Sequence, residues 1–315
     1  MRSFILPIIF KQLSLWLVTT FLLIVIIFIP RDVIYETSKY GDIQNVDYDY
    51  KIEKHIGNIK DFFISLKLNH GLGTYYEGNT IEEHIIDKSL RSVKLIIPAL
   101  ILGFFLGILK GIFDFVSKDR KLGIGNSTTW FMLSIPDLFF MISLQLLLML
   151  LYEIGVFPHI DLYGHEKLEN QVVCIIFLAI YPLLFIANMT YTSLIEEEKK
   201  DYILTARSKG INRLKIVNIH MLKNSIQKIL VNTNTMTLYM LSNLFIVEFL
   251  TNYRGAAFYF FQAISTPNSF TVGTDFSMNL NTTVGFTVVF TVIIFFSNAF
   301  FQIINYWVTP KGKGI

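Results

Sequence analysis

The sequence has few charged residues and a single cysteine. Of its 315 residues, 16% are charged and 53% are hydrophobic, whereas a soluble domain carries about 25% charged residues. The composition therefore predicts a membrane protein. Cys174 lies inside an apolar run, so a disulfide within the chain and any cysteine-based zinc or iron–sulfur site are excluded. We expect Cys174 to be a small buried hydrophobe.

Nucleotide-binding motifs are also missing from the sequence. It contains no glycine-rich phosphate loop, so any ATP hydrolysis that drives this protein must take place on a partner. Gly71-Leu72-Gly73 lacks the third glycine and the strand–helix surroundings of a dinucleotide fingerprint. The net charge of +3 gives no indication of nucleic-acid binding. We therefore expect no catalytic residue, no cofactor and no nucleic-acid partner.

Long apolar runs dominate the rest of the sequence. About 20 apolar residues are needed to cross the hydrocarbon core as a helix. Six segments meet this requirement and predict an all-α membrane protein with six transmembrane helices. The first segment is long for a signal peptide, and no small-residue cleavage pattern follows it, so we interpret it as a retained span. The predicted spans are 12–30, 95–115, 130–152, 172–194, 230–251 and 284–308.

The placement of lysine and arginine predicts the orientation of these spans. Loops on the side of the N-terminus are rich in both residues, with eight in 195–230 alone, whereas the short loops on the opposite side hold only Lys167 and Arg254. Both termini are therefore expected to face the cytoplasm. The predicted organisation is an N-terminus with the first span (1–30), an extracellular loop of about 60 residues (31–94) with helical pieces near 50–68 and 80–94, a core (95–308) containing a cytoplasmic loop (195–229), and a cytoplasmic tail (309–315).

The cytoplasmic segment 196–225 has the pattern of two short helices joined by a glycine, and we call it the elbow. Three glutamates precede a helical run that ends with Arg207 and Lys209, a charge order that complements a helix dipole. Gly210 follows at the position of a C-cap glycine, and Asn212 is placed to cap a second helix. One face of that second helix is expected to carry Leu214, Val217 and Met221.

Periodicity alone leaves two interpretations of the elbow open. Its lysines can contact anionic lipid at the membrane surface, or its charges and turns can receive a soluble partner. The residues of the elbow favour the second interpretation, because they resemble a known motif. Thr205-Ala206-Arg207-Ser208-Lys209-Gly210, followed by His220-Met221-Leu222-Lys223-Asn224, resembles the cytoplasmic EAA-type loop of ABC importer permeases, in particular the B-type subunit of the dipeptide, oligopeptide and nickel group.

Other parts of the sequence resemble the same family. The stretch from His70 to Thr74 is similar to a glycine-rich stretch ahead of the family's core, and Pro310 follows the last span where members usually carry Asp-Pro. Departures also occur. Leu204 and Thr205 replace the first two residues of the EAA triplet. Arg254-Gly255-Ala256-Ala257 stands in place of Pro-Gly-x-Gly, and the family's Asn-Arg-Asp-Tyr-Pro stretch has no counterpart in 265–278.

The resemblance implies a type I importer permease in a bacterial cytoplasmic membrane. Its implied partners are two ATPase subunits, a second homologous permease or self-copy, an extracellular solute-binding protein and membrane lipids. The implied solute is a peptide or a nickel or metal-chelate compound. A degenerate permease that acts as a non-transporting scaffold remains an alternative, because the outer motifs diverge. An ion-coupled secondary transporter is disfavoured, because neither an inverted repeat nor a buried ionisable pair is visible. The implied ATPase-coupling residues are Thr205, Ala206, Arg207, Lys209, Gly210, His220, Lys223 and Asn224.

Polar residues near the fifth span are candidates for a translocation path or gate. Glu248 lies near the span's outer end, where it either faces the bundle interior or is an ordinary interfacial charge. Asn234 and Asn243 either line a polar path or hydrogen-bond between helices. Arg254 and Gly255 follow this span, at the altered family motif. The loop residues His159, Asp161, His165 and Glu166 match no standard metal site, so we assign no metal ligand.

Overall fold

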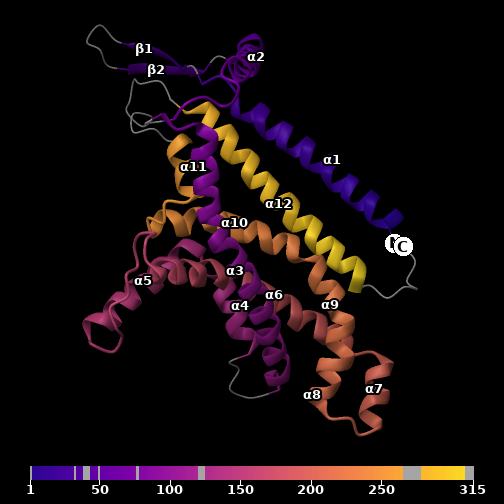
Figure 1. Cartoon of the computed structure of the whole chain (residues 1–315). Coiled ribbons are helices and arrows are strands. Elements are labelled where there is room, and N and C mark those ends of the chain that lie inside the picture. The colour runs from indigo at the N-terminus through magenta and orange to yellow at the C-terminus, as the bar shows by residue number, and fades with distance from the viewer. Residues whose placement is uncertain are drawn as a thin grey trace. The chain divides into compact units, whose positions relative to one another are not determined.

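The computed structural model describes residues 2–31, 33–37, 43–48, 50–75, 78–119, 125–264 and 278–308 (Figure 1). These residues are mainly helical, as the sequence predicts. The helices are α1 (Arg2–Ile27), α2 (Ile52–Leu68), α3 (Ile81–Ser117), α4 (Asn126–Ser134), α5 (Asp137–Glu153), α6 (Leu168–Glu198), α7 (Asp201–Ser208), α8 (Arg213–Lys215), the π-helical turn η2 (Ile216–Met221), α9 (Leu222–Val231), α10 (Thr233–Leu250), α11 (Ala256–Ile264) and α12 (Leu280–Val308).

The all-α prediction is wrong for one segment of the loop 31–94. Strands β1 (Val33–Thr37) and β2 (Ile43–Tyr48) pair as an antiparallel hairpin. Both are short, and their alternation of apolar and polar residues is too weak to stand out in the sequence. The helical piece predicted near 50–68 is confirmed as α2, whereas the piece predicted near 80–94 is the first part of the continuous helix α3.

The chain divides into two compact units. The first comprises Met1–Gln12, Val93–Tyr253 and Ile294–Ile315, and the second comprises Leu13–Ser92 and Arg254–Ile293. The division falls within α1, α3 and α12. In the second unit, α1 runs beside α12, where the hydroxyl of Thr20 donates to that of Thr291 at 3.2 Å (Figure 1).

Four helices of the described residues are long and apolar enough to cross a membrane: 9–27 of α1, α3, α6 and α12. The pair α4 and α5 raises the number to five if it is counted as one broken span. Predicted span 230–251 corresponds to the end of α9 and to α10, which does not qualify. Its 18 residues include Asn234, Asn243 and Glu248, and these lower its hydropathy.

The third predicted span is broken rather than straight. Helices α4 and α5 meet at an angle of 103° across a break that contains Pro136. A proline disfavours the helical conformation for the residue before it, and Ile135 is extended with φ −81° and ψ 133°. The freed carbonyl of Ile135 accepts a hydrogen bond from the Tyr181 hydroxyl of α6. Pro98 and Pro182, by contrast, lie inside continuous helices.

A glycine stripe lets α3 approach α6 closely in the first unit. A Cβ atom on Gly107 would lie 2.7 Å from Cβ of Ile186 and 2.8 Å from the carbonyl oxygen of Leu183. Gly103 and Gly111, one turn to either side, are similarly crowded by α6. Small residues four apart are the usual means of close helix contact in membranes. This G-x-x-x-G-x-x-x-G pattern is present in the sequence and would have predicted the contact.

Candidate functional site

The elbow has two arms, α7 before Gly210 and α8 with η2 after it, and the predicted glycine turn joins them. Gly210 has φ 71°, a conformation that favours glycine. Its N–H donates to the carbonyl of Arg207 at 2.9 Å, and the N–H of Ile211 donates to that of Ala206 at 3.3 Å. These two bonds form a Schellman motif, which ends α7. Asn212 caps the second arm, since its side-chain oxygen accepts from the N–H of Leu214 at 3.0 Å.

The buried face of the second arm differs from the predicted one. Val217 and Met221 are buried as expected, but Leu214 is 53% exposed and Ile216 is buried in its place. Only three residues of α8 precede the π-helical turn, and the wider turn shifts which side chains point inward. The prediction for Leu214 assumed a regular α-helix and is wrong.

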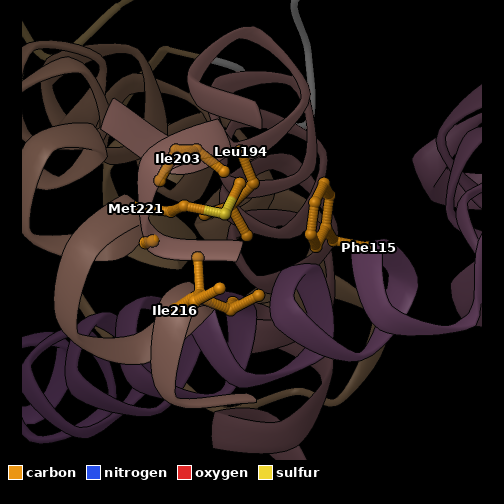
Figure 2. Packing of buried hydrophobic residues seen from close by; sticks show 7 residues of the cluster. Phe115, Leu194, Ile203, Ile216 and Met221 are labelled. Carbon is orange, nitrogen blue, oxygen red and sulfur yellow. The ribbon is translucent and has the colours of Figure 1, made fainter. Parts of the chain in front are cut away.

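A cluster of buried apolar side chains packs the elbow against the C-terminal ends of α3 and α6. Figure 2 shows Phe115 of α3 and Leu194 of α6 converging on Ile203, Ile216 and Met221 of the elbow. Fully burying each such side chain contributes about 1.5–3 kcal/mol. The elbow is therefore packed onto two long helices instead of hanging from them as a free loop. Ala206 and Val217 complete the buried cluster.

Charged residues surround this core. The carboxylate of Glu198, at the end of α6, accepts hydrogen bonds from Lys118, the residue after α3, and from Arg207 of α7, the latter at 2.6 Å. The side chain of Glu197 is 2% exposed and pairs with Lys200 at 2.7 Å. It also accepts a hydrogen bond from the Tyr202 hydroxyl. Burial, together with this hydrogen bond, raises the pKa of Tyr202.

Two further ion pairs lie at the edges of the same region. Asp119 binds Arg213 at 3.0 Å, and Glu196 binds Lys228 at 2.5 Å. A pocket of about 320 Å³ opens among these groups. Its floor is the apolar core, and its walls include Glu198, Arg207, Asp119 and Arg213.

The structure separates the predicted coupling residues into two groups. Thr205, Lys209 and Lys223 are exposed, together with the apolar side chains of Leu204 and Ile219. The others have contacts within the chain. Ala206 is buried in the core and His220 is half-buried, whereas Arg207 and Asn224 are exposed but bind other side chains: Arg207 pairs with Glu198, and Asn224 donates to the Tyr202 hydroxyl at 2.9 Å.

Sequence reasoning assigned no role to Glu197, Glu198 or Lys118 beyond general charge placement. The three glutamates at the start of the elbow were expected to complement the dipole of the helix that follows them, but the structure places them in the last turn of α6, where acids oppose the helix dipole and need cationic partners. The identity of those partners was not visible, since Lys118 lies 80 residues before Glu198.

The candidate path residues occupy different environments. Glu248 and Asn243 of α10 are buried, with exposed fractions of 0% and 1%. Neither the oxygen nor the nitrogen of the Asn243 amide has a hydrogen-bond partner among the described residues. Asn234 is exposed. In the second unit, Gly255 is buried and Arg254 is exposed with φ 24°.

The predicted loop between α5 and α6 is fixed by its own polar groups. Asp161 pairs with Lys167 at 2.9 Å, and this hydrogen bond lowers the pKa of the carboxyl. The Asn170 amide donates to the carbonyls of Asp161 and Tyr163 at 2.8 Å each. His159 lies edge-on to the ring of Tyr152, with centroids 5.0 Å apart. Each of these groups has a structural partner in the loop or in the adjoining turns of α5 and α6.

Comparison with known proteins identifies the family. The profile of the binding-protein-dependent transport system inner membrane component family matches residues 99–313. The chain belongs to this family. It is therefore an ABC importer permease, a transport protein of the inner membrane with several apolar helices.

Relatives and a solved structure agree with this assignment. The chain is 25% identical over 309 residues to the dipeptide transport system permease protein DppB of Lactococcus lactis, covering 94% of this chain and 97% of that protein. The Escherichia coli K12 protein of the same name is 35% identical over 60 residues, 19% of this chain and 18% of that protein. The fold is similar to a chain of the inward-facing MetNI methionine ABC transporter, with TM-score 0.55, 13% identity, and coverage of 72% and 96%.

Proposed function

We propose that this permease carries short peptides across a bacterial cytoplasmic membrane and that the elbow 196–225 receives its partner ATPase. It works as one of a pair of permeases, with two ATPases on the cytoplasmic side and a solute-binding protein outside. Six spans with both termini in the cytoplasm, an extracellular cap at 31–94 and a transport core at 95–308 complete the proposed architecture. In this arrangement α4 and α5 form one broken span, and α10 is the sixth span although it is less apolar than the others.

The geometry of the elbow carries the proposal. Its two arms are locked by the Gly210 turn and packed on α3 and α6 through the buried apolar cluster. A movement of the bound ATPase that displaces the elbow therefore also displaces two long helices, because the packed elements move as a rigid body. The exposed surface offers Lys209 and Lys223 for charged contacts, with Leu204 and Ile219 as apolar contacts. This mixed surface suits a soluble protein partner better than lipid headgroups alone.

The peptide assignment rests on the dipeptide permease of Lactococcus lactis, to which nearly the whole chain is similar. A polar path is supported by Asn243 and Glu248. The Asn243 amide has no hydrogen-bond partner among the described residues, which is rare for a buried polar group, and an intramembrane carboxylate such as Glu248 usually faces a bundle interior or a water-filled route. We propose that Asn243 and Glu248, which are buried within this chain, line a polar route through its bundle interior, with Arg254 and Gly255 at the outer gate.

The experiment that tests the proposal replaces the turn glycine. Gly210 and Gly155 have nearly equal φ values, 71° and 74°, and a Cβ at either would meet nothing within 4 Å. Both form the same pair of turn hydrogen bonds. Valine strains both turns equally, because β-branched residues avoid positive φ. We expect Gly210→Val to abolish co-purification of the ATPase and Gly155→Val to preserve it.

Transport is measured in the same preparation. The permease pair, its ATPases and the binding protein are reconstituted in vesicles, and uptake of labelled dipeptide is compared with uptake of a nickel chelate. Peptide-stimulated hydrolysis with dipeptide uptake supports the proposal. ATPase binding without uptake of either solute leaves the scaffold function, and equal co-purification by the two valine variants rejects the elbow as the docking site.

A further inference from the structure

Glu197 and Glu198 connect the end of α6 with three other elements. Glu198 binds Lys118, directly after the end of α3, and Arg207 of α7. Glu197 reaches the start of α7 through Lys200 and Tyr202. The Tyr202 hydroxyl in turn accepts a hydrogen bond from Asn224 of α9 at 2.9 Å. Two adjacent carboxylates therefore tie α3, α6, α7 and α9 together at one point.

These bonds supply a constraint that the apolar core does not. Hydrophobic packing has no direction, so the core beneath the elbow fixes its distance from α3 and α6 better than its rotation. Charge-assisted hydrogen bonds are directional and about twice as strong as neutral ones. The two carboxylates are also shielded, with side-chain exposures of 2% for Glu197 and 19% for Glu198, whereas their partners Lys200 and Arg207 are 47% and 46% exposed. The shielding of the carboxylates is what distinguishes these pairs from a fully exposed one.

We propose that Glu197 and Glu198 form a positioning hub that makes the elbow rotate as one body with α3 and α6, and that Arg207 acts inside this hub rather than on the ATPase. The inference rests on the proposed function, because it specifies how the elbow transmits motion. It reassigns Arg207, which the family resemblance implies as a coupling contact. Lys209 and Lys223 are exposed and form no ion pair within the described chain, so they remain for the partner.

The chain contains a matched control. Glu196 also ends α6 and also binds a lysine, Lys228, but the two side chains are 62% and 46% exposed. An exposed pair of this kind contributes little. Glu196→Gln therefore makes the same chemical change as Glu198→Gln, two residues away, outside the hub.

The first experiment uses the full complex with the ATPases and the binding protein. Glu198→Gln and Arg207→Gln are each expected to retain the ATPase but to lower the ratio of peptide-stimulated to basal hydrolysis about fivefold or more, a typical coupling effect. The double variant is expected to be no worse than either single variant, because both remove one shared contact. Arg207→Lys restores much of the ratio, and Glu196→Gln leaves it unchanged. Loss of the ATPase by Arg207→Gln, but not by Glu198→Gln, would instead make Arg207 a partner contact and overturn the hub.

A second measurement needs the permease only, so it separates failure of the hub from failure of the proposed function. Spin labels are placed at two exposed sites, Thr192→Cys on α6 and Ser208→Cys on α7, while the buried Cys174 stays unlabelled. The distance distribution is expected to be narrow in the parent and in Glu196→Gln and to broaden in Glu198→Gln. Equal widths in all three overturn the hub, whether or not the ATPase binds.

Discussion

The glycine stripe on α3 provides a graded test of helix packing in this permease. Replacing Gly107 with alanine adds one Cβ atom 2.7 Å from Cβ of Ile186 and 2.8 Å from the carbonyl oxygen of Leu183. Real Cβ contacts do not occur at such distances, and neither atom belongs to a flexible side-chain end. The two helices must therefore separate along the stripe.

The net effect is a difference between two opposing contributions. Overpacking a well-fitted contact typically costs about 1–3 kcal/mol, whereas alanine in place of glycine stabilises a helix by about 0.5–1 kcal/mol. The expected loss in the free energy of unfolding is thus about 1–2 kcal/mol. At about 2–4 °C per kcal/mol for a chain of this size class, the melting temperature should fall by about 2–8 °C.

The neighbouring glycines define the expected order. Gly111 is more crowded, with Cβ of Thr190 at 2.5 Å and the carbonyl oxygen of Ala187 at 2.6 Å. Gly103 is less crowded, with Cβ of Pro182 at 2.9 Å. Gly57, inside α2, has nothing within 4 Å and serves as the control. The loss should decrease from Gly111→Ala through Gly107→Ala to Gly103→Ala, and Gly57→Ala should be neutral or slightly stabilising.

The chain supplies its own reporter for this assay. Cys174 is the only cysteine and is buried in α6. A thiol-reactive fluorophore labels it only when the helices separate, so the labelling midpoint on heating gives the melting temperature in detergent. A Gly107→Ala protein as stable as the parent, or a change in Gly57→Ala of equal size, would refute the close-approach reasoning.

Two other predictions concern the elbow. Asn212→Ala removes the cap of the second arm and should cost about 0.5–2 kcal/mol, seen as faster hydrogen exchange across 212–221; exposed Asn218→Ala is the control, and equal exchange in both would argue against the cap. Burial opposes ionisation of Glu198, but its bonds to Lys118 and Arg207 outweigh this and lower its pKa. Because the pKa of Glu198 is lower in the folded than in the unfolded protein, ionised Glu198 stabilises the folded state above the unfolded pKa of about 4.3. This stabilisation is lost as the pH falls through the folded pKa. The melting-temperature gap between the parent and Glu198→Gln should therefore shrink from pH 7 to pH 4, and a gap that is constant or grows would contradict the assigned shift.

Local patterns predicted local structure well. The Gly210 turn and the Asn212 cap are confirmed because each depends on residues within five positions along the chain. Lys110 and Asp114 form an ion pair at the i,i+4 spacing that places two side chains side by side on a helix. Helix α2 follows directly from its own periodicity. The sidedness of the membrane and the docking role of the elbow stay predictions, because they concern partners outside this chain.

Non-local contacts decided the rest. The family resemblance implies a coupling contact for Arg207, and the structure adds an ion pair between this exposed residue and Glu198 at the end of α6. At the break before Pro136, the carbonyl of Ile135 accepts a hydrogen bond from Tyr181, 46 residues later. Leu214 was expected inward, but the π-helical turn changed the register.

The sequence by itself determined that this is an importer permease with long apolar helices and an elbow that turns at Gly210. Hydropathy, turn residues and family motifs depend on residues that are close together in the sequence, so they can be recognised without knowing which distant residues meet in the fold. Only the tertiary structure decided which elbow residues face outward and which tie the elbow to α3 and α6. The physical reason is that a charged or apolar side chain takes its role from the group it meets, and those groups come from helices far apart in the sequence.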